Sequence, residues 1–152
     1  DRDDLPAQRA DALCRYWGCT PAQRERFDEA MSRWLASDVR AEALAWPRRR
    51  AEVPFYTLGM DGLAERFGAY AEGAIDLLCT DPAHPGRALL IDYKTGGSPA
   101  EAPDRLREKH ALQASVYADV LHRAGYTDVV LKFVRVEVPD PDEPSQPQVV
   151  TY

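Results

Sequence analysis

The sequence contains few of the residues that mark a disulfide scaffold, a metal cluster or a membrane protein. Its 152 residues include three cysteines (Cys14, Cys19 and Cys79), which supply neither a paired disulfide framework nor a four-cysteine metal or cluster site. No apolar run approaches the about 18 residues of a transmembrane helix, and the N-terminal residues lack a signal-peptide pattern. We therefore expect a soluble intracellular protein with no membrane partner, in which two of the cysteines are small buried groups.

Positive charge is also scarce. The chain has 19 lysine and arginine residues against 25 aspartate and glutamate residues, which gives a net charge of −6. This balance argues against an autonomous nucleic-acid-binding protein, because contacts with phosphate favour basic surfaces. The length fits one domain with a sizeable core. The first residue is Asp1 and not methionine, so we expect the chain to be a piece of a longer protein.

The first third of the sequence is predicted to be helical. Residues 5–17 carry apolar residues at helical spacing, and Gly18 ends this run. Thr20, Pro21 and Gln23 form the pattern of an N-cap with a capping box, which predicts the start of a second helix. A short third helix is expected from Ser37-Asp38 to Trp46, so that residues 1–47 form a helical lead-in to a core of residues 48–152. The second helix carries an apolar stripe that we expect to be core: Phe27, Met31, Trp34 and Leu35.

The stretch Leu89-Leu90-Ile91-Asp92-Tyr93-Lys94-Thr95 is the most informative part of the sequence. An apolar run followed by the glycine pair at 96–97 predicts a buried strand over residues 87–94 that ends at its polar residues. Side chains alternate along a strand, so Asp92 and Lys94 should lie on the same face, roughly 7 Å apart. A simple ion pair at a sheet edge would explain them, and so would a functional site.

A second apolar run, Gly73-Ala74-Ile75-Asp76-Leu77-Leu78, contains one acid in the same way. We expect a strand from about Arg66 to Cys79, joined to the Asp92 strand by a hairpin loop at residues 81–86, so that the two strands are antiparallel neighbours. Both carboxylates could then meet at one point, which is what a hard divalent cation requires.

Three further strands are expected around this pair. Residues 52–56 fit an edge strand because Pro54 cannot donate to a central ladder. The residues before them, Arg48, Arg49 and Arg50, fit either a solvated surface run or a phosphate-contacting patch. Residues 127–138 are rich in β-branched side chains and predict a strand, and residues 148–152 predict a last edge strand.

A long helix is expected from Asp104 to Ala124, with Gly125 at the C′ position. Gln113 and Tyr117 are four residues apart and share a face with His110. An amphipathic helix lying across a sheet would explain this trio without any catalytic role. The order of elements predicts an α/β (α+β) fold, with a mixed β-sheet core flanked by helices.

These motifs together resemble the PD-(D/E)XK nuclease superfamily, whose restriction-endonuclease-like fold has this mixed core. More narrowly, they resemble the C-terminal nuclease domain of RecB/AddA-type (UvrD/Rep-like) helicase-nucleases. The shared pattern is an acid in one core strand, Asp-x-Lys at the end of the next, and Gln-x-x-x-Tyr on the following helix. The matching residues are Glu52–Phe55, Gly73–Leu77, Leu90–Thr95, Gln113 and Tyr117.

The resemblance implies a metal-dependent DNA exonuclease with defined roles for these residues. Asp76, Asp92 and the backbone carbonyl of Tyr93 would hold Mg²⁺ or Mn²⁺, which activates a water molecule. Lys94 would orient that water and offset negative charge on the phosphate. Gln113 and Tyr117 would position the DNA strand or metal-bound waters.

The resemblance also implies partners outside the chain. They are DNA, the helicase domains of a parent chain that uses ATP, and a second helicase-nuclease subunit, in the bacterial cytoplasm and in double-strand-break repair. Relatives usually carry an N-terminal histidine in the metal site, whereas the first histidine here is His84. We therefore expect the chain to begin after that histidine and to have weak or no activity alone. At His110 relatives often carry tyrosine.

Two alternatives stay open. The first is a non-catalytic DNA-binding or assembly module of the same fold, which the intact Asp76, Asp92 and Lys94 disfavour. The second is a stand-alone or Cas4-like nuclease. Cas4-like relatives hold an iron–sulfur cluster with four cysteines, and three cysteines at these spacings cannot supply one.

Overall fold

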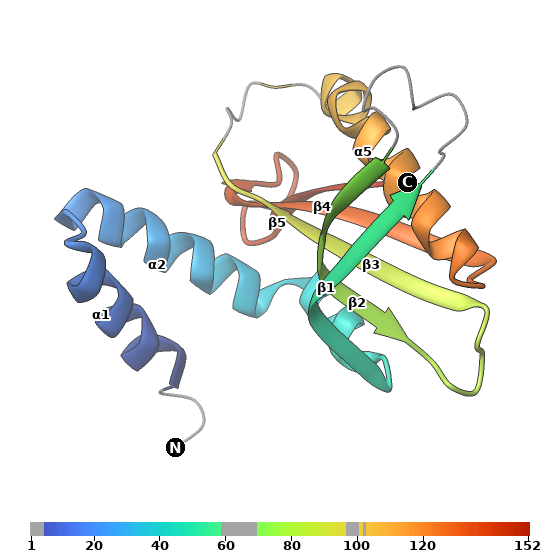
Figure 1. Ribbon diagram of the computed structural model, residues 1–152. Helices are drawn as coiled ribbons and strands as arrows, with labels where there is room; N and C mark the ends of the chain where they lie inside the picture. Colours follow the sequence, from blue (N-terminus) through green and yellow to red (C-terminus); the bar gives the residue numbers. More distant parts are fainter. Residues whose placement is uncertain (1–4, 59–69, 97–100, 102) are drawn as a thin grey trace.

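The computed structural model describes residues 5–58, 70–96, 101 and 103–152 (Figure 1). Five strands form one sheet, and helices cover both of its faces. The strands are β1 (Arg48–Leu58), β2 (Tyr70–Thr80), β3 (Arg87–Lys94), β4 (Asp128–Pro139) and β5 (Pro147–Thr151). This is the mixed sheet flanked by helices that the sequence predicts, so the restriction-endonuclease-like fold class is confirmed.

The strands lie in the order in which they follow one another in the chain. All neighbours are antiparallel except β3 and β4, which are parallel. A parallel pair needs a crossover connection, and α5 (Pro103–Arg123) provides it across one face of the sheet (Figure 1). The polar end of β3 therefore leads toward the start of α5, which places the side chains of both elements at the same end of the sheet.

Several element boundaries agree with the sequence prediction. β3 has the predicted bounds, and Gly125 follows α5 with φ 97°, a conformation that favours glycine. The hairpin between β2 and β3 is antiparallel as expected, and β1 and β5 are the two edge strands. The predicted start of the second strand, from Arg66, lies partly outside the described residues. The three arginines at 48–50 are part of β1 and do not precede it.

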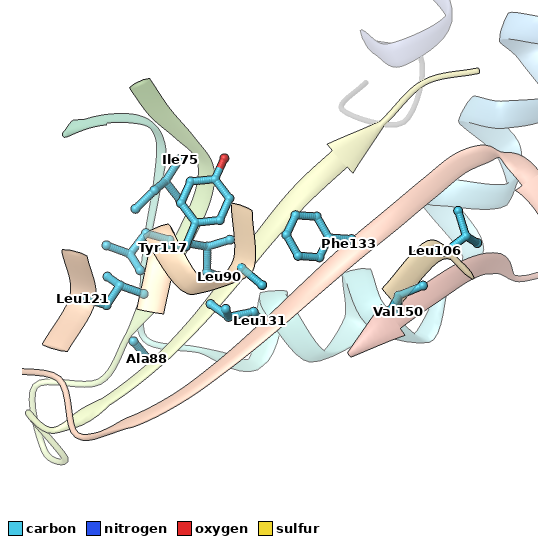
Figure 2. Close-up of a cluster of buried hydrophobic side chains, with 11 residues drawn as sticks. Ile75, Ala88, Leu90, Leu106, Tyr117, Leu121, Leu131, Phe133 and Val150 are labelled. Atoms are coloured by element: carbon cyan, nitrogen blue, oxygen red, sulfur yellow. The ribbon is translucent and has the colours of Figure 1, made fainter. Parts of the chain in front are cut away.

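Each face of the sheet carries its own apolar core. The core under α5 contains Leu90 and Phe133 from the sheet and Leu121 from the helix, all at most 2% exposed (Figure 2). Helical spacing predicts that Val116 and Val120 pack beneath the helix, but the residues of α5 that fill this core are Leu106, Ala114, Tyr117 and Leu121. The opposite core joins Ile91 and Val134 to α3 (Asp38–Ala45).

The N-terminal helices begin where the sequence predicts. α1 (Leu5–Trp17) is followed by α2 (Pro21–Ala36), whose N-cap Thr20 forms the expected capping box with Gln23. Ser37 caps α3. In Figure 1, α1 and α2 extend away from the sheet as an arm. None of the helices in the described ranges is both long and apolar enough to cross a membrane.

Two expectations about burial are wrong. α2, all of whose residues are described, has no buried residue, and its apolar stripe lines an open groove because α1 covers only part of it. Trp34 alone packs against the α3-side core, and Leu35 is 37% exposed. Of the three cysteines only Cys79 is buried; Cys14 is half-buried and Cys19 is exposed.

Candidate active site

The polar end of β3 places an acid and a lysine on the sheet face that α5 covers. Asp92 lies opposite Phe133 in the parallel ladder, and Lys94 lies opposite Arg135. Asp92 is only 4% exposed, and its Oδ1 is 2.6 Å from Lys94 Nζ. Tyr93 lies on the other face, where its ring packs edge-on against Trp34 at 4.9 Å. The alternation of the strand therefore brings Asp92 and Lys94 together.

Two residues of α5 complete a closed hydrogen-bond network around Asp92. The Tyr117 hydroxyl donates to Asp92 Oδ2 at 2.7 Å, and Gln113 Nε2 donates to the same oxygen at 3.1 Å. Gln113 Oε1 accepts from Lys94 Nζ at 2.7 Å, and its Nε2 also donates to the Tyr117 hydroxyl at 2.9 Å. Because residues four apart share a helix face, both side chains reach the end of β3 at once.

Asp76 occupies the gap where β2 separates from β3. The ladder between these strands runs from Thr80–Ala88 to Leu77–Ile91 and stops before Asp76. The Tyr93 backbone N–H, which has no ladder partner on β2 there, donates to Asp76 Oδ2 at 2.7 Å. The carboxylate therefore replaces a strand carbonyl and is held at the backbone of Tyr93, the residue that follows Asp92.

The strand itself is distorted at this point. Ile75 and Leu78 both belong to the α5-side core, whereas Leu77 packs on the opposite side, so the two-residue alternation changes phase at Asp76. On β1, the residue opposite is Glu52, which has a left-handed φ of 50°. A non-glycine residue with this φ is strained, and such strain is found preferentially at functional sites.

The electrostatics of two tyrosines report on both carboxylates. Burial, the hydrogen bond to Asp92 and the charge of that carboxylate raise the pKa of Tyr117, and the charge of Asp76 raises it further. Burial and the Asp76 charge raise the pKa of Tyr93 to about 12. Both acids are thus within electrostatic reach of one hydroxyl, Tyr117, although Asp76 lies in the strand gap.

Asp92 has one oxygen that suits a cation. Its Oδ1 is buried and has no hydrogen-bond donor among the described residues, since the close Lys94 ammonium makes an ion pair without hydrogen-bond geometry. A buried carboxylate oxygen without a donor is costly and is a natural cation ligand. Two carboxylates and the Tyr93 carbonyl would be an all-oxygen donor set, which fits Mg²⁺ or Mn²⁺. No group of three or more His, Cys, Asp or Glu ligands occurs in the described ranges.

An aromatic platform beneath the network was missed by the sequence analysis. The buried ring of Phe133 lies 5.1 Å from Lys94 Nζ and stacks on His110 at 5.4 Å and on Tyr117 at 6.3 Å. Burial and the charge of Lys94 lower the pKa of His110, which favours a neutral imidazole beside the ammonium. The parallel pairing of β3 with β4 creates this contact, and a sequence pattern does not reveal which residues will be opposite each other.

A buried cation, Arg135, lies opposite Lys94 in the ladder. Arg135 is 3% exposed and donates to Gln148 Oε1 at 2.5 Å and to Glu101 Oε2 at 3.3 Å. Glu101 precedes α5, so this ion pair ties the start of the helix to β4. An arginine inside a β-branched run was the available clue, because such a residue is seldom buried without a partner.

Arg48, Arg49 and Arg50, which the sequence suggested as a phosphate-contacting patch, lie away from the Asp92 network. Arg50 pairs with Leu78, which pairs with Leu90, four residues before Lys94 on β3. Arg48 and Arg49 lie further toward the β2–β3 hairpin. Arg49 donates to the carbonyls of Leu44 and Trp46 at the end of α3. The structure therefore does not bring these arginines to the Asp92 network.

Comparison with known proteins supports one assignment. A search of curated proteins finds no match. The model of the PD-(D/E)XK nuclease superfamily matches residues 1–152. The site described above contains the ordered acids of β2 and β3, the lysine two residues after Asp92 and the Gln-x-x-x-Tyr pair on α5. The chain therefore belongs to the PD-(D/E)XK nuclease superfamily.

Proposed function

We propose that the chain is a metal-dependent nuclease domain that hydrolyses DNA phosphodiester bonds as an exonuclease. The observation that carries the proposal is the buried Asp92, whose Oδ2 is held by two donors from α5 while its Oδ1 has no hydrogen-bond donor among the described residues. This arrangement fixes the carboxylate, and a bound metal ion would share Oδ1 with the Lys94 ammonium, which lies 2.6 Å from it.

The contacts of the side chains support the following roles. Asp76, Asp92 and the Tyr93 carbonyl would hold Mg²⁺ or Mn²⁺, which when bound supplies Lewis-acid activation of the phosphate and of a water molecule. Lys94 places a positive charge 2.6 Å from Asp92 Oδ1 and is oriented by Gln113, so it is suited to hold the attacking water and to offset charge on the phosphate. Gln113 and Tyr117 keep Asp92 in one rotamer, which is a positioning role.

We further propose that the domain works within an ATP-dependent helicase-nuclease for double-strand-break repair. The net charge of −6 supports this, since a separate motor can hold the DNA that an acidic nuclease domain binds weakly. In such a parent protein, Asp92→Ala should abolish DNA cleavage and leave ATP-driven unwinding unchanged.

The test is digestion of linear and closed circular DNA by the parent protein with Mg²⁺ or Mn²⁺, comparing the wild type with Asp92→Asn. The matched control is Asp128→Asn. Asp128 is the first residue of β4, far along the strand from Phe133, and its side chain is 64% exposed. We expect the wild type and Asp128→Asn to degrade the linear DNA only, and only when the metal is present. Asp92→Asn should degrade neither DNA. Cleavage that persists in Asp92→Asn would refute the proposed site.

A second candidate function is a non-catalytic DNA-binding or assembly module of the same fold. The observation in its favour is that the described residues supply two carboxylates at the site and no larger ligand cluster. Titration calorimetry separates the two candidates: metal binding without any cleavage by the parent protein would favour the module.

A further inference from the structure

The turn between α1 and α2 brings two cysteines together. α1 ends in a Schellman motif, in which Gly18 has φ 63° and the Cys19 N–H donates to the Cys14 carbonyl at 2.9 Å. In this motif the residue after the glycine packs against the residue five positions earlier, a contact that is usually hydrophobic. Here both positions are cysteine.

The backbone bond limits how far apart the two residues can be. With standard bond lengths, a 2.9 Å N···O hydrogen bond keeps the α-carbons of Cys14 and Cys19 at most about 6.8 Å apart. Disulfides span α-carbon separations of about 4.4–6.8 Å, so the turn already satisfies this requirement. Both side chains also line the same part of the surface, because Cys14 and Cys19 lie together in two adjoining hollows beside the turn.

The two sulfur atoms are accessible, in contrast with the third cysteine. Cys19 is exposed and Cys14 is half-buried, and both line an apolar groove of about 640 Å³ that continues past Trp17 and Trp34. Cys79 is fully buried in the α3-side core, and burial raises its pKa to about 11. A reagent in solution therefore reaches the pair and not Cys79.

We propose that Cys14 and Cys19 form a dithiol modification site that closes to an intramolecular disulfide when a peroxide oxidises it. Hydrogen peroxide converts one thiol to a sulfenic acid and releases water. The second thiol attacks that sulfur, which forms the S–S bond and releases a second water, so that two thiols are oxidised and one peroxide is reduced. The site is independent of the proposed nuclease function.

The disulfide would fix the wall of the groove at the α1–α2 turn. The groove is lined on its other side by Tyr93 and Thr95, the residues that flank Lys94. Oxidation therefore acts on the arm that adjoins the end of β3, without touching the Asp92 network on the opposite face.

The test uses the whole chain, reduced, desalted and treated with hydrogen peroxide. We expect the number of thiols titrated after denaturation to fall from three to one. Trypsin cleaves after Arg15, between the two cysteines, so peptides 10–15 and 16–24 should stay joined, lighter by two hydrogens, until a reductant separates them.

Two variants provide the controls. Cys79→Ser should fall from two thiols to none and give the same joined peptides, whereas Cys14→Ser should give no joined peptides. Circular dichroism verifies that each variant is folded. Three thiols after treatment would overturn the proposal, and so would thiol loss through sulfinic acid or a disulfide-linked dimer in place of the joined peptides.

Discussion

Replacing Tyr117 by phenylalanine tests the network around Asp92 with little disturbance of the core. The ring of Tyr117 packs against Phe55 at 5.8 Å and Phe133 at 6.3 Å, and phenylalanine keeps both contacts. The change removes only the hydroxyl, which donates to Asp92 Oδ2 at 2.7 Å and accepts from Gln113 Nε2. Asp92 Oδ2 would then retain Gln113 as its donor.

The structure sets the size of the expected effect. A hydrogen bond to a carboxylate contributes about 1.5–3 kcal/mol, and water cannot replace it easily because Asp92 is 4% exposed. For a protein of this length, that loss corresponds to a fall in melting temperature of roughly 3–12 °C. We therefore expect Tyr117→Phe to lower the free energy of unfolding by about 1.5–3 kcal/mol.

The assay is urea unfolding followed by tryptophan fluorescence, with Tyr152→Phe as the matched control. The Tyr152 hydroxyl donates to the exposed Arg107 carbonyl at 2.7 Å, where water can take its place. This control should cost at most about 0.5–1 kcal/mol. If Tyr117→Phe lowers the free energy of unfolding no more than Tyr152→Phe does, the Tyr117 hydroxyl does not stabilise Asp92. The hydrogen-bond network around Asp92 would then be wrong.

Three further predictions follow from the same geometry. Lys94→Met should abolish DNA cleavage but tighten Mn²⁺ binding by calorimetry, because an ammonium no longer competes for Asp92 Oδ1 at 2.6 Å; weaker metal binding would contradict this. Glu52→Gly should raise the free energy of unfolding by roughly 0.5–1 kcal/mol, since glycine tolerates a φ of 50°, whereas Ala51→Gly on the same strand should lower it. The free energy of unfolding should fall as the pH rises from about 9 through 12. In the folded state Cys79 and Tyr93 keep their protons up to raised pKa values of about 11 and 12, whereas the unfolded chain loses these protons near 9 and 10. Denaturant midpoints measured across this pH range would check the prediction, with Cys79→Ala removing the contribution of the cysteine.

Much of the fold could be predicted from the sequence because short local motifs mark where its helices and strands begin and end. The capping box at Thr20, the glycine at 125 and the apolar run that ends at Lys94 each act within a few residues of themselves. The pairing of Gln113 with Tyr117 follows equally from helix geometry. For these features, neighbouring residues decide the conformation, and the predicted and observed boundaries agree closely.

Features that depend on tertiary placement could not be predicted in this way. The stripe on α2 has the spacing of a core-facing helix, yet α2 extends beyond the sheet and leaves the stripe half-covered. Phe133 supports Lys94, His110 and Tyr117 only because β4 pairs in parallel with β3 at one register. Register between distant strands is set by the whole fold, so no local pattern identifies Phe133.

The position of Asp76 shows where the simple strand rule fails and why. Strict alternation would place Ile75 and Leu77 on one face, whereas the structure buries them on opposite faces. The change of phase occurs opposite the strained Glu52 and leaves the Tyr93 N–H without a strand partner on β2. Asp76 accepts from that N–H and so becomes fixed in the strand gap at the backbone of Tyr93. Departures from local rules concentrate at functional sites, because a fold tolerates strain where it must place a functional side chain. In this chain the departure falls on the acid that the proposed metal site requires.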